Sequence, residues 1–412
     1  MRVDRGHRLW LAGVAAASAL VLAACGSSDD KTTGGGGGST SSSDPIKITM
    51  ITGTGPGTPG AEGIPGAKAA VSDVNDNGGV NGRKLELTVC DAKADANLAG
   101  ACARTAVGDK DQVATVGNAL YGYTDQQYAV QNQAKMPAIG VKMYGLAEHG
   151  SPMSFPVEAG GIGSVPAGVA LLAAKGVKKV MFVSVNVPSS TNTDAFIRKY
   201  VMPTFPNSSY IKPVLVPTTQ TDMQATSAEI IRSAPDGIQV GLPPAQAIAF
   251  VKTIRAQGYT GPLVIPSSVL TAQQIKDQIG AAAGNLIISG EFSHEGPGWE
   301  AFLAGMKKYQ PDANVTEQGT NPWISVHMFA DVAKTISGPI TRESVLAAFQ
   351  KLDHYDTKGL TPALDYTKPP TYEGYTRDFN PTVVELQYKD GVISNVPPVK
   401  FTNVFTGQAL TS

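Results

Sequence analysis

The sequence predicts an α/β protein with two lobes, each built from a doubly wound parallel sheet with helices on its faces. Short apolar, β-branched runs alternate with segments of helical periodicity along most of the 412 residues, which is the order typical of such sheets. A Gly- and Pro-rich crossing at residues 145–166 divides the alternation into two series. A folded body of about 370 residues also exceeds what one hydrophobic core usually holds.

The first strand–helix–strand unit occupies residues 46–89. Residues 46–52 are apolar and β-branched, which indicates a buried strand. A loop rich in Gly and Pro follows, and residues 66–74 have Ala and Val at helical spacing. The Asn-Gly-Gly sequence at 77–79 ends this helix, because Gly accepts the left-handed cap conformation. Residues 83–89 return as a second strand, which the crossover makes parallel to the first.

The alternation continues along the rest of the chain. Further strands are predicted at residues 113–116, 138–141, 180–185, 213–216, 238–240, 263–265 and 286–289. Helices are predicted at residues 95–107, 124–133, 165–175, 193–201, 223–233, 245–257, 272–279, 298–309, 323–336 and 342–352. A strand pair at 383–389 and 392–396, joined by the turn dipeptide Asp390-Gly391, completes the second series.

The first 24 residues are typical of a targeting segment. A basic start precedes an apolar stretch at residues 9–24, which is shorter than the ~20 residues that a membrane-spanning helix needs. The ending Leu-Ala-Ala-Cys resembles a bacterial lipobox, in which Cys25 would be acylated and anchor the protein to the membrane. An ordinary secretory signal with a chance cysteine is the alternative. Residues 25–44 are polar and Gly-rich, which predicts a flexible tether.

The chain has three cysteines. If Cys25 carries lipid, Cys90 and Cys102 remain as an even pair in an oxidising compartment. Cys90 ends the second strand and Cys102 lies on the next helix, so we predict a disulfide between them; two buried free thiols are the alternative. We predict no metal site, because no CxxC or HxxxH spacing accompanies these residues.

Charge and motifs exclude several classes of function. The chain has 33 Lys and Arg against 34 Asp and Glu, which leaves no basic surface for nucleic acid. Residues 55–60 match GxGxxG, but Pro56 and Pro59 remove backbone donors that would hold a pyrophosphate, so a ligand loop is the better interpretation. The sequence contains no GxSxG elbow and no HExxH, and we therefore predict neither an enzyme nor a cofactor.

Polar and aromatic residues follow the predicted strands at their carboxyl ends, where open α/β sheets bind ligands. Tyrosines there would line a small-molecule pocket while donating a hydroxyl, although they could instead pack on a neighbouring helix. The predicted ligand-binding residues are Thr54, Gly55, Tyr121, Tyr123, Thr124, Lys142 and Tyr144 in the first series and Asn186, Ser189, Pro243, Gln246 and Ser267 in the second.

The stretch NDNGGVNGRKLELTVCDAKAD at residues 75–95 resembles the opening of the type I periplasmic solute-binding proteins, specifically the branched-chain amino-acid-binding family of ABC transporters. The resemblance implies two Rossmann-like lobes joined by a hinge of three crossovers. Its lobe 1 would comprise 45–159 and 293–382, and its lobe 2 would comprise 160–292 and 383–412. It further implies an extracytoplasmic monomer that closes on a small solute and delivers it to ABC permease subunits in the membrane, to which the lipobox cysteine Cys25 would anchor it.

The residues at the implied ligand positions depart from the amino-acid-binding pattern. Asn186 stands where the family usually has an aspartate, and the carboxylate that pairs with the ligand ammonium would fall near Ser267. Because an unpaired buried ammonium is very costly, we expect an organic acid, an aromatic or apolar carboxylate or an amide-like solute instead of a standard branched-chain amino acid. Lys142, if it points inward, would favour a carboxylate. A ligand-sensing receptor that reports to a membrane partner is the alternative function, and an exported enzyme is a third.

Overall fold

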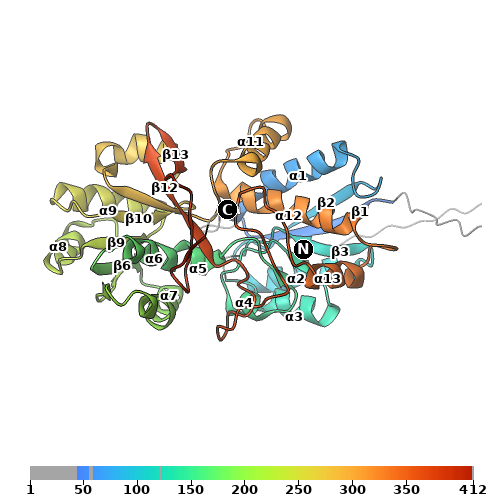
Figure 1. Ribbon diagram of the computed structural model, residues 1–412, viewed down its shortest axis with the longest axis horizontal. Coiled ribbons are helices and arrows are strands. Elements are labelled where there is room, and N and C mark those ends of the chain that lie inside the picture. The colour runs from blue at the N-terminus through green and yellow to red at the C-terminus, as the bar shows by residue number, and fades with distance from the viewer. Residues whose placement is uncertain (1–43, 55–58, 121, 411–412) are drawn as a thin grey trace, which may run out of the picture. The chain divides into compact units, whose positions relative to one another are not determined.

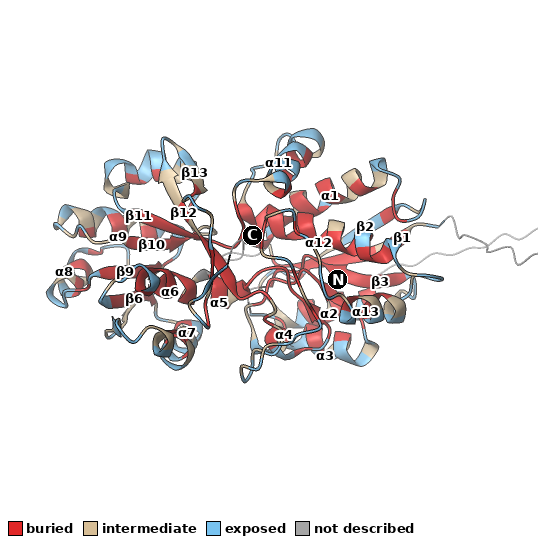
Figure 2. Ribbon diagram, viewed as in Figure 1, coloured by how far each residue is buried: buried red, intermediate tan, exposed pale blue. Residues whose placement is uncertain are grey.

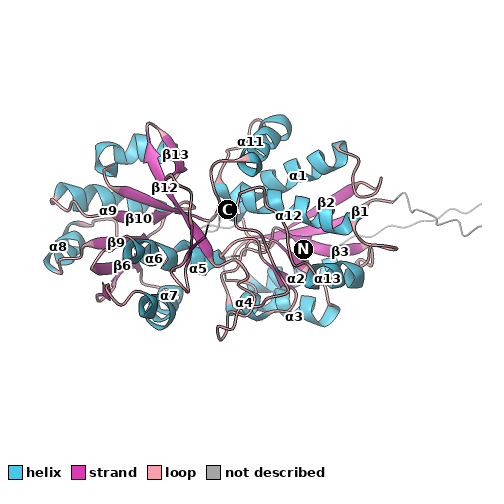
Figure 3. Cartoon of the chain, viewed as in Figure 1, coloured by secondary structure: helices cyan, strands magenta, loops and turns pink. Residues whose placement is uncertain are grey.

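The computed structural model describes residues 44–54, 59–120 and 122–410. Their strands form two sheets, and helices lie against both of them (Figure 1 and Figure 3). We call the first sheet with its helices lobe 1 and the second sheet with its helices lobe 2. The predicted targeting segment, the tether, Cys25, Gly55 and Tyr121 lie outside the described residues.

The sheet of lobe 1 has the strand order β2-β1-β3-β4-β5, and every neighbouring pair in it is parallel. Its strands are β1 (Ile46–Thr52), β2 (Leu85–Asp91), β3 (Gln112–Val116), β4 (Ala138–Ile139) and β5 (Ser154–Phe155). β1 is apolar on both faces and almost wholly buried, as expected for a central strand of a parallel sheet. The carboxyl ends of these strands therefore meet at one edge of the sheet.

Eight helices belong to lobe 1 among the described residues. They are the 3₁₀ helix Pro59–Gly63, α1 (Ile64–Asp76), α2 (Ala96–Gly108), α3 (Asp125–Ala134), α4 (Leu146–Gly150), α11 (Pro297–Tyr309), α12 (Glu317–Lys334) and α13 (Arg342–Gln350). α1 and α12 approach closely because Gly66 has no side chain; a Cβ there would lie 2.0 Å from the carbonyl oxygen of Gly319. Side chains of α11, α12 and α13 share one hydrophobic core with β1 and β3.

The prediction for the helix at 323–336 was wrong at its start. α12 begins at Glu317 and contains Pro322, a residue type that ordinarily disrupts a helix interior. Every residue from Glu317 to Val326 is buried, so packing on all sides holds the helical conformation despite the missing backbone donor. Figure 2 shows this helix as buried as the neighbouring strands.

The sheet of lobe 2 has the order β15-β14-β12-β11-β10-β9-β6-β7, with β13 paired to β12 and β8 paired to β6. The first six strands in sequence are parallel, and the last four pair antiparallel. They are β6 (Lys179–Val185), β7 (Ser209–Tyr210), β8 (Val214–Val216), β9 (Gly237–Gly241), β10 (Leu263–Pro266), β11 (Leu286–Gly290), β12 (Thr382–Lys389), β13 (Val392–Asn395), β14 (Phe401–Asn403) and β15 (Ala409–Leu410).

The helices of lobe 2 cover both faces of its sheet. They are α5 (Gly160–Ser164), α6 (Pro166–Ala174), α7 (Pro188–Phe196), α8 (Gln224–Arg232), α9 (Pro244–Ala256) and α10 (Ala272–Gln274). Two of them continue as π-helical turns followed by 3₁₀ turns, at Ile197–Val201 and Met202–Thr204 after α7 and at Ile275–Ile279 and Gly280–Ala283 after α10. α6 is buried all round, and α8 and α9 bury one face against the strands, as Figure 2 shows.

The chain passes between the two lobes three times. The first crossover runs from β5 to α5, the second from β11 to α11, and the third from α13 to β12. The side chain of Asn380 in the third crossover donates a hydrogen bond of 2.9 Å to the carbonyl of Val157 in the first, so these segments are in contact. The predicted fold class, two doubly wound lobes joined by a three-crossover hinge, is confirmed.

Candidate functional site

The loops that follow β1, β3 and β4 lie side by side at the carboxyl edge of the first sheet. The amide of Gly53 donates to the carbonyl of Ala119 over 3.0 Å, and the amide of Lys142 donates to the carbonyl of Asn118 over 2.8 Å. Ala119 forms isolated parallel bridges with Thr52 on one side and with Lys142 on the other. The structure thus brings the loop of Thr54 and the loop of Lys142 to one place, as parallel strands require.

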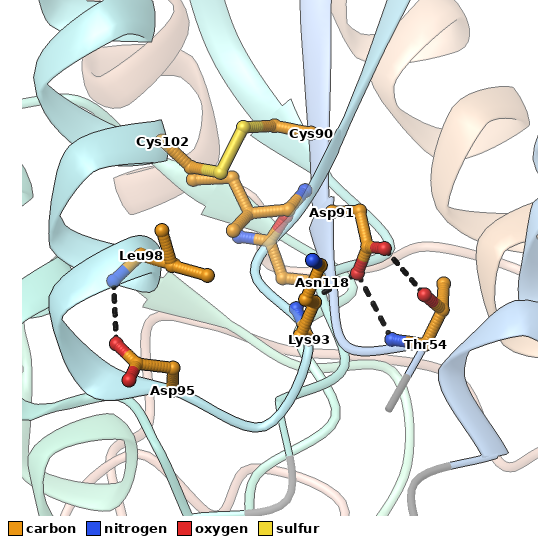
Figure 4. The surroundings of a disulfide bond; sticks show 9 residues. Thr54, Cys90, Asp91, Lys93, Asp95, Leu98, Cys102 and Asn118 are labelled. Carbon is orange, nitrogen blue, oxygen red and sulfur yellow. Dashed lines mark hydrogen bonds between the residues drawn. A yellow bond between two sulfur atoms is a disulfide. The ribbon is translucent and has the colours of Figure 1, made fainter. Parts of the chain in front are cut away.

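The β1 loop is held by the carboxylate of Asp91, which ends β2. The amide of Thr54 donates to it over 3.1 Å, and the Thr54 hydroxyl forms a further, very short contact with it (Figure 4). The amide of Lys93 donates to the same carboxylate over 2.8 Å. Burial alone would raise the pKa of Asp91, but these hydrogen bonds outweigh it and lower the pKa. The hydroxyl of Thr54 is therefore engaged within the protein in this conformation.

The predicted disulfide is confirmed, and it anchors this part of the site. Cys90 and Cys102 are bonded with their Cα atoms 5.8 Å apart, which links the end of β2 to α2 (Figure 4). That separation lies within the ordinary range for disulfides. Asp91 is the next residue after Cys90, so the bridge restrains the carboxylate that holds the β1 loop.

Buried polar side chains set the shape of the β3 loop. The side chain of Asn118 accepts a hydrogen bond of 2.9 Å from the amide of Ile51 and donates one of 2.8 Å to the hydroxyl of Thr115. Gln131 on α3 donates to the same hydroxyl over 2.9 Å. Thr124, just before α3, is 1% exposed, and its hydroxyl has no hydrogen-bond partner among the described residues. Tyr123, in contrast, is exposed.

The β4 loop is organised by a glutamate that the sequence analysis did not single out. The carboxylate of Glu148 on α4 accepts hydrogen bonds of 2.7 Å from the amide of Tyr144 and 2.5 Å from that of Gly145. Burial raises the pKa of Glu148 to about 7, although these two bonds oppose the shift. The side chain of Tyr144 is half-buried, and its backbone is fixed by this carboxylate.

Lys142 points into the protein, where it meets carboxylates from two crossovers. Its ammonium lies 3.9 Å from Oε1 of Glu158 in the first crossover and in direct contact with Oε2 of Glu291 in the second. Glu317, at the start of α12, accepts hydrogen bonds of 2.8 Å from the backbone amides of Glu291 and Phe292. We call Lys142, Glu158, Glu291 and Glu317 the crossover charge cluster.

The crossover charge cluster is buried and carries more acidic than basic groups. The exposed fractions are 1% for Lys142, 0% for Glu158, 1% for Glu291 and 6% for Glu317. Burial, reinforced by the nearby Glu158, raises the pKa of Glu291 to about 8, although Lys142 opposes the shift. Burial also raises the pKa of Glu158, again against Lys142. The positive charge of Lys142 is thus already compensated in this conformation.

After β6, β9 and β10 the carboxyl edge of the second sheet presents neutral groups, whereas Glu291, which follows β11, is paired with Lys142. Asn186, Ser189 and Pro243 are exposed, and Ser267 is half-buried with its amide donating over 2.9 Å to the carbonyl of Ser289. The side chain of Gln246 is buried and donates to the carbonyls at 217 and 220 over 3.0 and 2.7 Å, so it holds the loop after β8. The part of the chain that the structure describes holds no group of metal-ligating side chains that could bind an ion.

Comparison with known families agrees with this architecture. Residues 45–371 match the family model described as "Periplasmic binding protein". The chain belongs to the periplasmic binding protein family. Members of this family bind substrates and are not enzymes, and they act outside the cytoplasm. A comparison with curated proteins finds no significant match.

Solved structures of periplasmic binding proteins share the fold at low sequence identity. A fatty acid ABC transporter substrate-binding protein from Thermomonospora curvata superposes with a TM-score of 0.70 at 19% identity, covering 90% of this chain and 93% of that one. A branched-chain amino acid transporter substrate-binding protein from Streptococcus pneumoniae, in complex with isoleucine, gives 0.67 and 19%, covering 86% and 100%. A substrate-binding periplasmic protein from Ralstonia solanacearum gives 0.70 and 16%, covering 85% and 100%.

None of the helices that the structure describes is both long and apolar enough to cross a membrane.

Proposed function

We propose that this periplasmic binding protein is the lipid-anchored substrate-binding component of an ABC importer. The observation that carries the proposal is the meeting of the β1, β3 and β4 loops at one sheet edge in a two-lobe fold with three crossovers. Such a fold closes its lobes around a small ligand by rotation at the crossovers. Cys25 would carry the lipid, residues 25–44 would tether the lobes to the membrane, and the closed form would deliver solute to permease subunits.

The solute we propose is an organic acid, an apolar carboxylate or an amide. The predicted contacts in lobe 2, including Asn186, Ser189 and Ser267, offer no carboxylate for a ligand ammonium. In lobe 1 the nearby Asp91 already accepts several hydrogen bonds. A zwitterionic amino acid would therefore bury an unpaired ammonium, which is strongly unfavourable. The buried, unpartnered hydroxyl of Thr124 is suited to receive a polar group of the solute.

A thermal-unfolding screen of the full chain in detergent would test this function. Unfolding would be followed by tryptophan fluorescence in the presence of organic acids, fatty acids, amides, sugars and amino acids. A solute that binds only the folded state stabilises it by RT ln(1 + [L]/Kd), so a tight solute must raise the melting temperature. A shift with leucine, isoleucine or valine would refute our solute class, and no shift with any compound would refute the function.

Thr124→Val is the matched variant for the solute site. It keeps the shape of the side chain and removes the hydroxyl that has no partner in the described residues. Its own stability should be nearly unchanged, because no internal hydrogen bond is lost. Loss of solute binding with retained stability would support the position of the site, whereas unchanged affinity would place the solute elsewhere.

A further inference from the structure

The crossover charge cluster connects a binding loop to the hinge. Lys142 follows β4 in lobe 1, and its amide donates to the carbonyl of Asn118 in the β3 loop. Its ammonium contacts Glu158 in the first crossover and Glu291 in the second. Rotation of the lobes changes the backbone of the crossovers. Such a rotation would therefore alter the distances between this one ammonium and its two carboxylates.

We propose that Lys142 is a positioning residue that couples the proposed solute loops to the hinge, and that proton uptake by the glutamates around it shifts the open–closed equilibrium of the lobes. This inference rests on the proposed solute-binding function for its biological meaning, but the coupling itself is a property of the protein without solute.

The charge balance of the cluster supports the link to protons. One lysine faces three glutamates, and all four side chains are buried. Oε1 of Glu291 and Oε2 of Glu317 have no hydrogen-bond partner in the described part of the chain. Uncompensated buried carboxylates are strongly disfavoured, so the cluster holds a proton near neutral pH. The raised pKa of Glu291, about 8, agrees with this balance.

Other ionisable groups face the cluster from the elements packed against it. His294 in the second crossover has its Nε2 atom 3.8 Å from Oε1 of Glu317. His149 on α4 interacts electrostatically with Glu158 and lowers its pKa, and His149 is itself paired with Asp378 over 2.9 Å. Asn321 on α12 donates to Glu158 over 3.4 Å and adds no charge. Two imidazoles thus lie near the cluster, and variants at Glu291 separate its contribution from theirs.

The geometry also explains why a proton would move the hinge. With Glu291 ionised, its carboxylate attracts the Lys142 ammonium and holds the second crossover against the β4 loop of lobe 1. With Glu291 protonated, that attraction is lost, while Glu158 in the first crossover still pairs with Lys142. The ionised and protonated forms of Glu291 therefore restrain different crossovers. If the open and closed conformations differ in their affinity for this proton, a change in pH shifts the balance between them.

The test measures the lobe-to-lobe distance in the full chain without any solute. Fluorophores attached through unnatural amino acids at the exposed positions Lys110 in lobe 1 and Lys252 in lobe 2 would report energy transfer between pH 6 and 9. We expect transfer to change with pH across this range in the native protein. Glu291→Gln should abolish this change. Glu385→Gln is the matched control, because Glu385 pairs with Lys175 over 2.8 Å within lobe 2.

Each outcome of this experiment decides the proposal. If Glu291→Gln keeps the native pH profile, or if the native protein shows no pH dependence, the proposal is wrong. Lys142→Met should also lose the pH dependence. Should that variant fail to fold, the double variant Lys142→Met/Glu291→Gln removes both charges together, which is far less disruptive than removing one. The double variant should also lose the pH dependence, and retention of it would count against Lys142.

Once a solute is found, the pH dependence of its Kd offers a second test of the proposal. A single linked proton changes Kd by at most about tenfold per pH unit. We expect such a slope in the native protein and a flat profile in Glu291→Gln. Because energy transfer is measured without solute, a failure of the proposed function in the screen and a failure of the proton-linked hinge give different results.

Discussion

Removal of the Cys90–Cys102 bridge should lower the stability of the folded chain by about 3 kcal/mol. The two cysteines are 12 residues apart in sequence. In the chain-entropy model, releasing a loop of that size restores about 3 kcal/mol of conformational freedom to the unfolded state. The double variant Cys90→Ala/Cys102→Ala removes the bridge without leaving a free thiol.

Guanidinium unfolding, followed by circular dichroism, would measure this loss as a lower midpoint. Cys102 is buried and Cys90 half-buried, so a small packing loss adds to the entropic one. The native protein treated with a reductant separates the two effects, since it keeps both side chains and loses only the covalent link. An unchanged midpoint after verified reduction would refute the reasoning that this bridge restrains the unfolded chain.

Two further predictions concern the β4 loop. Burial raises the pKa of Glu148 to about 7, so the folded state binds the proton of this carboxyl more tightly than the unfolded state does. The tighter proton binding stabilises the folded state fully below about pH 4.5, and this stabilisation is lost as the pH rises to about 7. In the native protein the free energy of unfolding in urea should fall by about 3 kcal/mol over this pH range because of Glu148, and Glu148→Gln should abolish that fall. An unchanged pH dependence in the variant would contradict the raised pKa of Glu148. Gly140→Ala should destabilise the protein by more than about 2 kcal/mol, because φ is +63° and a Cβ would lie 1.6 Å from the Ser325 hydroxyl oxygen. Gly82→Ala, with φ of +85° and open space, is the control and should lose only about 1–2 kcal/mol; equal losses in both would show that the contact with Ser325 is unimportant.

Much of the fold could be predicted because individual strands and turns depend on residues that are close together in the sequence. The buried strand at 46–52 agrees with β1, and the turn dipeptide Asp390-Gly391 joins β12 to β13 with φ of +53° and +84°. Both features depend on neighbouring residues alone, namely β-branched apolar side chains and a residue that tolerates left-handed backbone. The disulfide was predicted for a similar reason, since consecutive elements pack together.

The charge cluster could not be predicted in the same way. Glu158, Glu291 and Glu317 are far apart in sequence, and single acidic residues in loops are ordinarily solvated. The one sequence signal for Glu291 is its apolar setting, Ile-Ile-Ser-Gly-Glu-Phe, and Glu317 lies in a polar stretch that gives no such signal. Lys142 was singled out for its loop, but its partners depend on how the crossovers meet. Tertiary packing likewise keeps Pro322 inside a helix.

The strand order has a consequence for how the chain acquires its structure. β12 lies between β11 and β14 in the second sheet, although residues 297–350 of lobe 1 separate it from β11 in sequence. Lobe 1 in turn needs α11 to α13, which come after most of lobe 2. Lobe 1 therefore cannot finish folding before α13 has been made, and lobe 2 cannot do so before the last strands of the chain have been made. Contacts of such long sequence separation slow folding, which would leave time for an unfolded chain to be exported before it becomes compact.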